Sequence, residues 1–196
     1  DRTELEKRQL QQFEQILKSY EQNEKNYEST KGETTVAQLT GRPRTINGIA
    51  ASEKDVFIVC GETKGFGYAV WRMSHEFSQP KQILSAISGC CGQMDIQVVG
   101  EDILLAENTR HRFARYDREG KAVGAWGKRG NESTADCFGG CCNPMNVRAI
   151  KNGDVFPAES EGFIKRFGPK GENLGIVAHA KLTGGCKNVA VGASPD

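Results

Sequence analysis

The sequence predicts an all-β protein made of repeated four-stranded antiparallel units and preceded by one α-helix. Glycine accounts for 23 of the 196 residues. Because tight reversals of the chain need residues that tolerate positive φ, this content favours a turn-rich β protein over a helical bundle. The first segment is the exception, since residues 4–28 contain neither glycine nor proline. After it, short apolar runs bounded by turn residues recur in one order, which is typical of repeated β units.

Composition and charge exclude several classes of protein. Lys and Arg together number 26 and Asp and Glu 25, which gives a formal net charge of +1. This balance argues against a strongly basic nucleic-acid-binding protein and against an acidic tail, so no nucleic-acid partner is predicted. The sequence contains no run of about 18 apolar residues, and no membrane span is therefore predicted.

Residues 1–32 are predicted to form a charged helical leader, joined to the rest of the chain by a linker at residues 33–41. Apolar residues in the leader follow the spacing of one helix face. They are Leu10, Phe13, Leu17, Tyr20 and Tyr27. We interpret the segment as a docked helix or a charged stalk. The alternative is a short coiled coil with weak self-association, for which about three heptads are marginal.

Two stretches of the chain match each other along their whole length. The segment 89–96 begins Gly-Cys-Cys, and so does the segment 140–147, with an offset of 51 residues. Residues 103–108, 114–120 and 122–126 then match 155–160, 165–171 and 173–177 in the same order. Each element is a short apolar run between turns, so each repeat is predicted to be a four-stranded antiparallel meander.

A four-stranded repeat of about 50 residues has the size of one blade of a β-propeller. We assign residues 42–196 to a partial β-propeller with three whole blades and the start of a fourth. The blades are expected at about 46–88, 89–136 and 137–184, with an incomplete one at 185–196. Closed propellers have typically 4–8 blades, and the sequence ends in the turn signal Ser194-Pro195-Asp196. We therefore expect a piece of a longer protein, and the sequence starts at Asp1 without a signal segment.

One blade resembles a known repeat. Residues 103–127 combine an apolar strand, an acidic residue, an Asn-Thr-Arg-His-Arg turn, a strand ending in Asp-x-x-Gly and a last strand ending in Trp-Gly. Together with Asn143-Pro144, this stretch resembles the NHL-repeat β-propeller family, and the Gly-Cys-Cys version resembles cysteine-rich NHL-like proteins of planctomycete-type bacteria. The resemblance implies a six-bladed, protein-binding fold and an extracytoplasmic location, periplasmic or secreted. The cysteines, Pro157 inside a strand, and Glu161-Gly162 in place of the Arg-His-Arg turn depart from the family pattern.

In a meander, the connection into the first strand lies at the same end as the connection between the second and third strands. We call this end of the sheets the loop end. The cysteines expected there, as disulfide or metal candidates, are Cys90, Cys91, Cys137, Cys141, Cys142 and Cys186. The binding-face candidates are Glu107, Asn108, Arg110, His111, Glu159 and Lys187. Because Glu107 and Glu159 recur at one blade position, we expect them to accept backbone N–H bonds rather than to catalyse.

Three interpretations of the cysteines stay open. Disulfides could join adjacent blades, which requires an oxidising compartment. Converging thiolates could instead hold a soft metal such as zinc or copper(I), although adjacent cysteines seldom ligate one metal comfortably. The cysteines could also be small buried apolar residues, and Cys60 is interpreted as a core residue or a free thiol. No cofactor is predicted beyond this candidate soft metal.

The favoured function is a non-catalytic scaffold that presents its cysteine-rich loop end to a protein or an exported ligand. The alternatives are a metal-dependent hydrolase or lyase with its metal in the channel, and a thiolate metal or redox site. The enzyme would need several His or carboxylate side chains at the starts of the first strands. The sequence offers only Gln93, Asp95, Asn146 and Asn188 there, and no catalytic residue is assigned.

Overall fold

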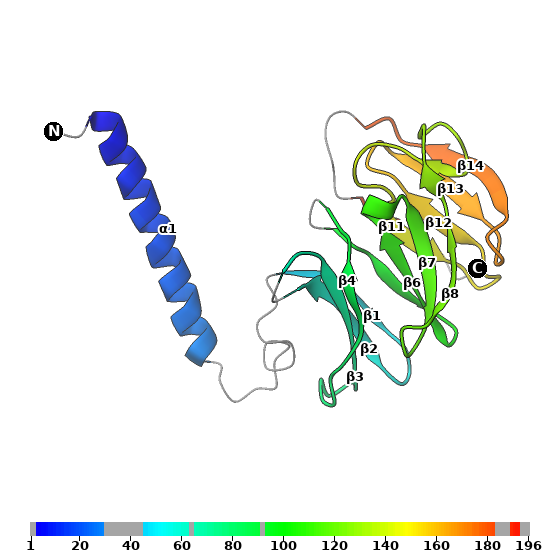
Figure 1. The fold of residues 1–196 in the computed structure, drawn as a ribbon, viewed down its shortest axis with the longest axis horizontal. Helices are drawn as coiled ribbons and strands as arrows, with labels where there is room; N and C mark the ends of the chain where they lie inside the picture. The colour runs from blue at the N-terminus through cyan, green and yellow to red at the C-terminus, as the bar shows by residue number, and fades with distance from the viewer. Residues whose placement is uncertain (1–2, 30–44, 63–64, 91–92, 183–188, 193–196) are drawn as a thin grey trace. The chain divides into compact units, whose positions relative to one another are not determined.

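The computed structural model describes residues 3–29, 45–62, 65–90, 93–182 and 189–192. The chain separates into two compact units, residues 1–35 and 36–196. The α-helix lies in the first unit and the strands lie in the second (Figure 1). The predicted linker at 33–41 lies outside the described residues, as do Cys91, Cys186, Lys187 and Asn188.

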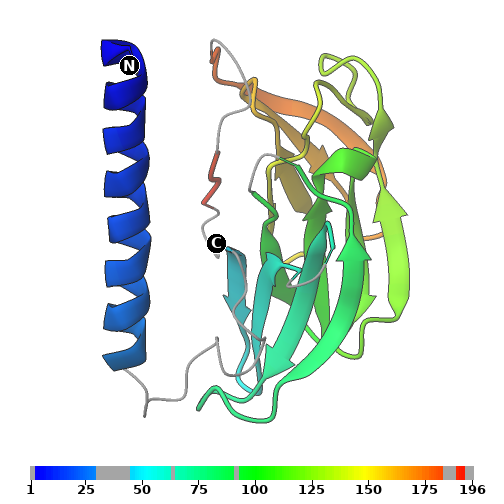
Figure 2. The ribbon, with the colours of Figure 1, turned by 60° about the vertical axis from the view of Figure 1, so that its left-hand side comes forward.

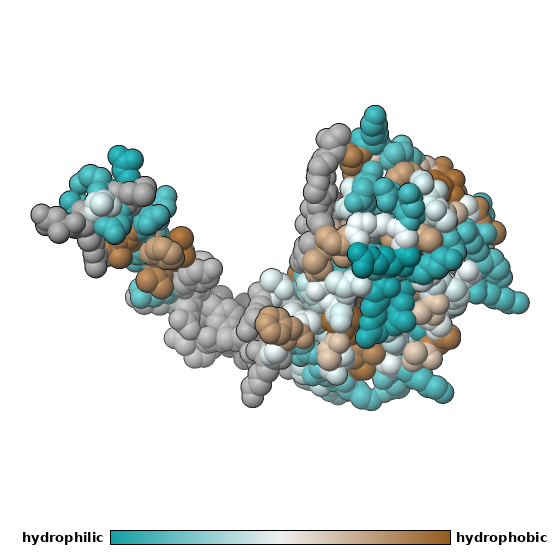
Figure 3. Space-filling view, turned by 45° about the horizontal axis from the view of Figure 1, so that its top comes forward, coloured by the Kyte–Doolittle hydropathy of each residue, from teal (hydrophilic) through white to brown (hydrophobic). Residues whose placement is uncertain are grey.

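The predicted N-terminal helix is confirmed as α1 (Glu4–Ser29). It begins with a capping box: the backbone N–H of Thr3 donates to Glu6 Oε2 at 2.7 Å, and the N–H of Glu6 donates to Thr3 Oγ1 at 3.3 Å. Phe13 on its apolar face is 66% exposed, and Figure 3 shows apolar and polar residues together on the helix surface. No helix in the described part of the chain is long and apolar enough to cross a membrane.

The second unit contains three four-stranded antiparallel sheets, each with its strands in chain order. The first sheet holds β1 (Ile46–Ala51), β2 (Val56–Gly61), β3 (Tyr68–Met73) and β4 (Lys81–Ile87). The second holds β5 (Ile96–Val99), β6 (Asp102–Glu107), β7 (Arg112–Asp117) and β8 (Ala122–Trp126). The third holds β11 (Asn146–Ala149), β12 (Val155–Ala158), β13 (Phe163–Phe167) and β14 (Asn173–His179). The predicted all-β class with antiparallel sheets is therefore confirmed, and Figures 1 and 2 show the sheets following one another in chain order.

A polar contact repeats in all three sheets. In each, an Asp at the start of the second strand pairs with an Arg near the end of the third strand. The pairs are Asp55 with Arg72 at 3.0 Å, Asp102 with Arg115 at 2.9 Å, and Asp154 with Arg166 at 2.7 Å. This contact shows that the first sheet, whose sequence matches the others weakly, is built on the same plan.

One pair of short strands was not predicted from the sequence. β9 (Lys128–Arg129) and β10 (Cys137–Phe138) form a two-stranded parallel ladder between the second and third sheets along the chain. Phe138 is fully buried, and its ring lies 6.3 Å from that of Phe167. Gly127 has a φ of 102°, and a Cβ there would lie 2.3 Å from the Phe138 ring. Glycine is thus needed where the chain leaves β8.

The core lies between the sheets, with the second sheet in the middle. Successive side chains of a strand point to opposite faces, and residues 103–107 of β6 are all buried. Ile103 belongs to a cluster that includes Phe57 of the first sheet. Its neighbour Leu104 belongs to another cluster that includes Val147 of the third sheet. The continuous apolar run of β6 is explained by this burial on both faces.

The first strands of the three sheets lie side by side, because β5 contacts both β1 and β11. Gln97 joins two of them: the N–H of Ala149 donates to its Oε1 at 2.6 Å, and its Nε2 donates to the carbonyl oxygen of Ala149 at 3.2 Å. Residues 189–192 lie at the same edge, where the N–H of Val191 donates to Asn146 Oδ1 at 3.0 Å.

Candidate functional site

Three cysteines from two different connections come together. Cys90 follows β4, whereas Cys141 and Cys142 lie between β10 and β11, and their three Sγ atoms lie within 4.8 Å of one another. We call this set the sulfur group. The Sγ atoms of Cys141 and Cys142 are 2.9 Å apart. Cys141 is exposed, Cys90 is half-buried and Cys142 is 1% exposed. A group of this kind can hold a metal ion, and it is the one such His, Cys, Asp or Glu group found among the residues that the structure describes.

Asn108 holds the Cys90 connection in place. It begins the short 3₁₀ helix η1 (Asn108–Arg110), which follows β6, and its side chain is fully buried. The backbone N–H of Cys90 donates to Asn108 Oδ1 at 3.2 Å. Its Nδ2 donates to the carbonyl oxygens of Cys90, at 3.3 Å, and of Gln93. The side-chain amide of Asn108 therefore holds two residues of this connection, Cys90 and Gln93.

An asparagine also holds the cysteine connection of the third sheet. Asn143 lies in the cysteine connection itself, directly before a cis bond to Pro144. Its Oδ1 accepts the N–H of Ser160 at 2.8 Å, and its Nδ2 donates to Glu161 Oε2 at 2.7 Å and to the carbonyl oxygen of Gly139 at 3.0 Å. Each cysteine connection is thus bonded to the loop between the second and third strands of its own sheet, which brings both loops to the sulfur group.

The two recurrent glutamates are fully buried at the ends of β6 and β12. The Glu107 carboxylate accepts hydrogen bonds from three side chains: Arg112 Nε at 2.6 Å, Arg110 Nη1 at 3.4 Å and the Tyr116 hydroxyl. Burial and this carboxylate raise the pKa of Tyr116 to about 12. Both carboxylate oxygens of Glu107 therefore accept hydrogen bonds within the second sheet.

Glu159 combines a backbone contact with an ion pair. Its Oε2 accepts the N–H of Gly139 at 2.8 Å, and its Oε1 pairs with Lys165, which is also fully buried and donates to the carbonyl oxygen of Cys137. Burial raises the pKa of this carboxyl group. These contacts fasten β10 and the start of the cysteine connection to the third sheet.

Two further loop-end candidates, His111 and Arg110, lie in the loop that follows β6 and are not part of the sulfur group. His111 adopts a left-handed conformation with a φ of 52°, and its N–H donates to the carbonyl oxygen of Asn108 at 3.3 Å. Burial, followed by the charge of Arg129, lowers its pKa. Arg110 has a side chain 46% exposed and is the accessible cation of this loop.

Two cysteines lie apart from the sulfur group. Cys137 is buried in β10, where its Sγ lies 3.4 Å from Asp136 Oδ1, and burial raises the pKa of its thiol. Cys60 lies in β2 and is buried in a cluster with Ile58 and Met73 of the same sheet, and burial raises the pKa of its thiol to about 11. Both are free thiols.

The polar residues at the starts of the first strands bond to the third sheet or to residues 189–192. Asp95 Oδ2 accepts from Asn146 Nδ2 at 2.8 Å and from the N–H of Val147 at 2.9 Å, and it pairs with Arg148. Gln93 exchanges two hydrogen bonds with Val189, at 2.9 and 3.3 Å. Burial raises the pKa of Asp95. These side chains are thus used to join elements of the fold.

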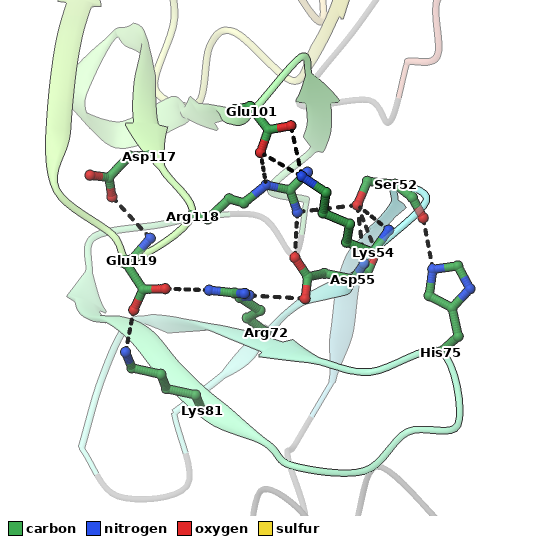
Figure 4. A network of polar contacts seen from close by, with 10 residues as sticks. All are labelled: Ser52, Lys54, Asp55, Arg72, His75, Lys81, Glu101, Asp117, Arg118 and Glu119. Atoms are coloured by element: carbon green, nitrogen blue, oxygen red, sulfur yellow. Dashed lines mark hydrogen bonds and ion pairs between the residues drawn. The ribbon is translucent and has the colours of Figure 1, made fainter.

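An ionic network that the sequence pattern did not predict lies at the opposite end of the first and second sheets (Figure 4). Asp55 pairs with Arg118 as well as with Arg72, and Glu101 binds Arg118 Nε at 3.0 Å. Exposed contacts of Lys54 with Glu101, and of Arg72 and Lys81 with Glu119, extend the network. Each carboxylate faces two cations, so the network fastens the turn after β7 to the first sheet.

Comparisons with known proteins assign no family. No family model matches the chain, and no curated protein matches it. One similar solved structure is a protein of unknown function from Bacteroides caccae, 13% identical with a TM-score of 0.46. Another is a member of the DUF4221 family from Bacteroides vulgatus, 14% identical with a TM-score of 0.42. The matches cover 71% and 67% of this chain but 46% and 41% of those proteins, so the chain spans less than half of their length.

Proposed function

We propose that the three sheets are consecutive blades of an NHL-like β-propeller and that residues 185–196 begin the next blade. Two observations support this arrangement. The second sheet buries alternate side chains against the first and the third, and the first strands of all three lie side by side. Radial stacking around an axis produces both features.

The exposure of the last strand of the third sheet fits the same proposal. β14 is exposed along nearly its whole length, and its apolar side chains Leu174, Ile176 and Val177 are 50%, 37% and 47% exposed. On the side that Figure 3 shows, apolar residues of the second unit are scattered among polar ones. A neighbouring blade packed on β14 would cover these side chains, and the six blades implied by the NHL resemblance would close the ring.

The proposed function is a non-catalytic binding module whose loop end meets the ligand, a protein or an exported small molecule. The observation that carries it is the convergence of four loops, two from each of two sheets, on the sulfur group. Buried asparagines fix these loops, so the surface is set before a ligand arrives, which lowers the entropic cost of binding.

The enzyme alternative has less support. A propeller-type hydrolase or lyase would direct carboxylates and His side chains from the first strands to a metal in the channel. Here Asp95 and Asn146 bond to each other, and Gln93 bonds to Val189.

An extracytoplasmic location and weak self-association through α1 complete the proposal. The location follows from the NHL resemblance, and the self-association follows from the exposed apolar face of the helix.

Selection of displayed random peptides on the immobilised chain tests the binding face. Peptides should bind the loop end, so binding should fall on Arg110→Glu and persist on Lys54→Glu. Both variants reverse a cation with an exposed side chain, at opposite ends of the sheets. Because Arg110 pairs with the buried Glu107 whereas Lys54 pairs with the exposed Glu101, circular dichroism checks that both variants fold. Equal loss on both variants, or turnover of esterase or lactonase substrates with added calcium, would contradict the proposal.

A further inference from the structure

We propose that Cys90, Cys141 and Cys142 bind one Cu(I) ion as three thiolate ligands. The inference rests on the proposed function, because it names a ligand of the same loop end.

The donor set decides the class of metal. All three donor atoms are sulfur, and no His, Asp or Glu belongs to the group found in the described part of the chain. Calcium and magnesium take oxygen ligands, whereas thiolates select soft ions such as Cu(I) and zinc. A structural zinc site is closed by four protein ligands, but Cu(I) is satisfied by three thiolates. Within the part of the chain that the structure describes, three sulfurs therefore favour Cu(I).

The spacing of the sulfurs fits one ion. Metal–sulfur bonds of about 2.3 Å in a trigonal plane place the sulfurs about 4.0 Å apart. The sulfur pairs here run from 2.9 Å for Cys141 with Cys142 up to a limit of 4.8 Å, which brackets that value. Cys141 must turn away from Cys142 by about 1 Å for both to ligate, and its exposed side chain has room to do so.

The backbone around the sulfurs is already fixed. Asn108 bonds the peptide groups of Cys90. Asn143 directly follows Cys142 and bonds to the loop between β12 and β13 and to Gly139 of its own connection. Hydrogen bonds of this kind around a metal site typically change its affinity by about 10–100-fold. The buried Cys142 anchors the ion within the protein, while the exposed Cys141 leaves a path from solvent.

The test is titration of the reduced chain with Cu(I) against a chromophoric Cu(I) chelator in the absence of oxygen. We expect one ion per chain, with copper–sulfur distances and three sulfur neighbours in X-ray absorption. Cys90→Ser and Cys142→Ser should each weaken binding about tenfold or more, and Asn108→Ala about tenfold. Cys137→Ser and Cys60→Ala are matched controls, because they remove thiols outside the group, and they should bind as the parent does.

Several results would overturn the assignment. These are no binding by the folded, reduced chain, unchanged affinity in Cys90→Ser, or a need for Cys91 or Cys186 in place of a named ligand. Tight zinc binding with no Cu(I) site would overturn the choice of copper, and a disulfide that persists within the group would remove the ligands. The peptide selection needs no metal, so failure of the copper site leaves that test of the loop end intact.

Discussion

Replacing Asp95 with alanine is expected to destabilise the joint between the second and third sheets. The Asp95 carboxylate accepts from the side chain of Asn146 and the N–H of Val147, which are 2% and 0% exposed. Alanine would leave both donors buried without a partner, and each such loss costs about 1–3 kcal/mol. Arg148 is partly exposed and turns to solvent at little cost. Since the charged Asp95 is itself costly to bury, the net loss is about 2–4 kcal/mol.

Urea unfolding followed by intrinsic fluorescence measures this loss. Asp136→Ala is the matched control, because Asp136 also forms an ion pair, at 2.7 Å from Lys128, but on the surface. Its removal should leave the free energy of unfolding nearly unchanged. Equal changes in the two variants would refute the reasoning that Asp95 joins the sheets.

Three further predictions follow from buried groups and one close approach. In the reduced native chain, iodoacetamide should label the exposed Cys141 well before Cys60, whose pKa of about 11 keeps it a thiol; equal labelling rates would contradict its burial. Gly171→Ala should lower the unfolding midpoint in urea, because φ is 85° there and a Cβ would lie 1.7 Å from Nε1 of Trp126; an unchanged midpoint would show that the third sheet does not approach Trp126. Because the pKa of Glu159 is raised, the folded chain binds a proton on this carboxyl group more tightly than the unfolded chain does. Its contribution to stability is thus fully present below the ordinary carboxyl pKa and is lost as pH rises through the raised value, so parent and Glu159→Gln should differ in their pH dependence over this window when urea unfolding is repeated at several pH values.

The repeated apolar runs and turns carried most of the fold information in the sequence. Runs such as 103–107 lie between turn residues at a regular offset, so they predicted the strands β6 and β12 closely. The Asp–Arg pairs could also have been found, since Asp102 and Arg115 recur as Asp154 and Arg166. The β9–β10 ladder could not, because two-residue strands have no periodicity to detect.

The site was predictable in outline only. The repeated Gly-Cys-Cys indicated that cysteines would gather at one end. It did not indicate that Cys137 would lie in the β9–β10 ladder, outside the sulfur group. The roles of the asparagines were also hidden, because Asn108 and Asn143 occupy different loops and still bond the same kind of connection. Such contacts depend on the packing of whole sheets, which no local pattern records.

The central claim is that successive sheets bring the Cys90 connection to the Cys141 connection. Bridging of thiols by dibromobimane in a Cys91→Ser, Cys137→Ser, Cys142→Ser chain tests it most directly, because trypsin then separates Cys90 (residues 82–110) from Cys141 (residues 130–148). The account predicts that mass spectrometry finds these two peptides joined by one bridge in the folded chain and separate after bridging in urea. Folded protein that carries only single adducts on Cys90 and Cys141 would contradict it.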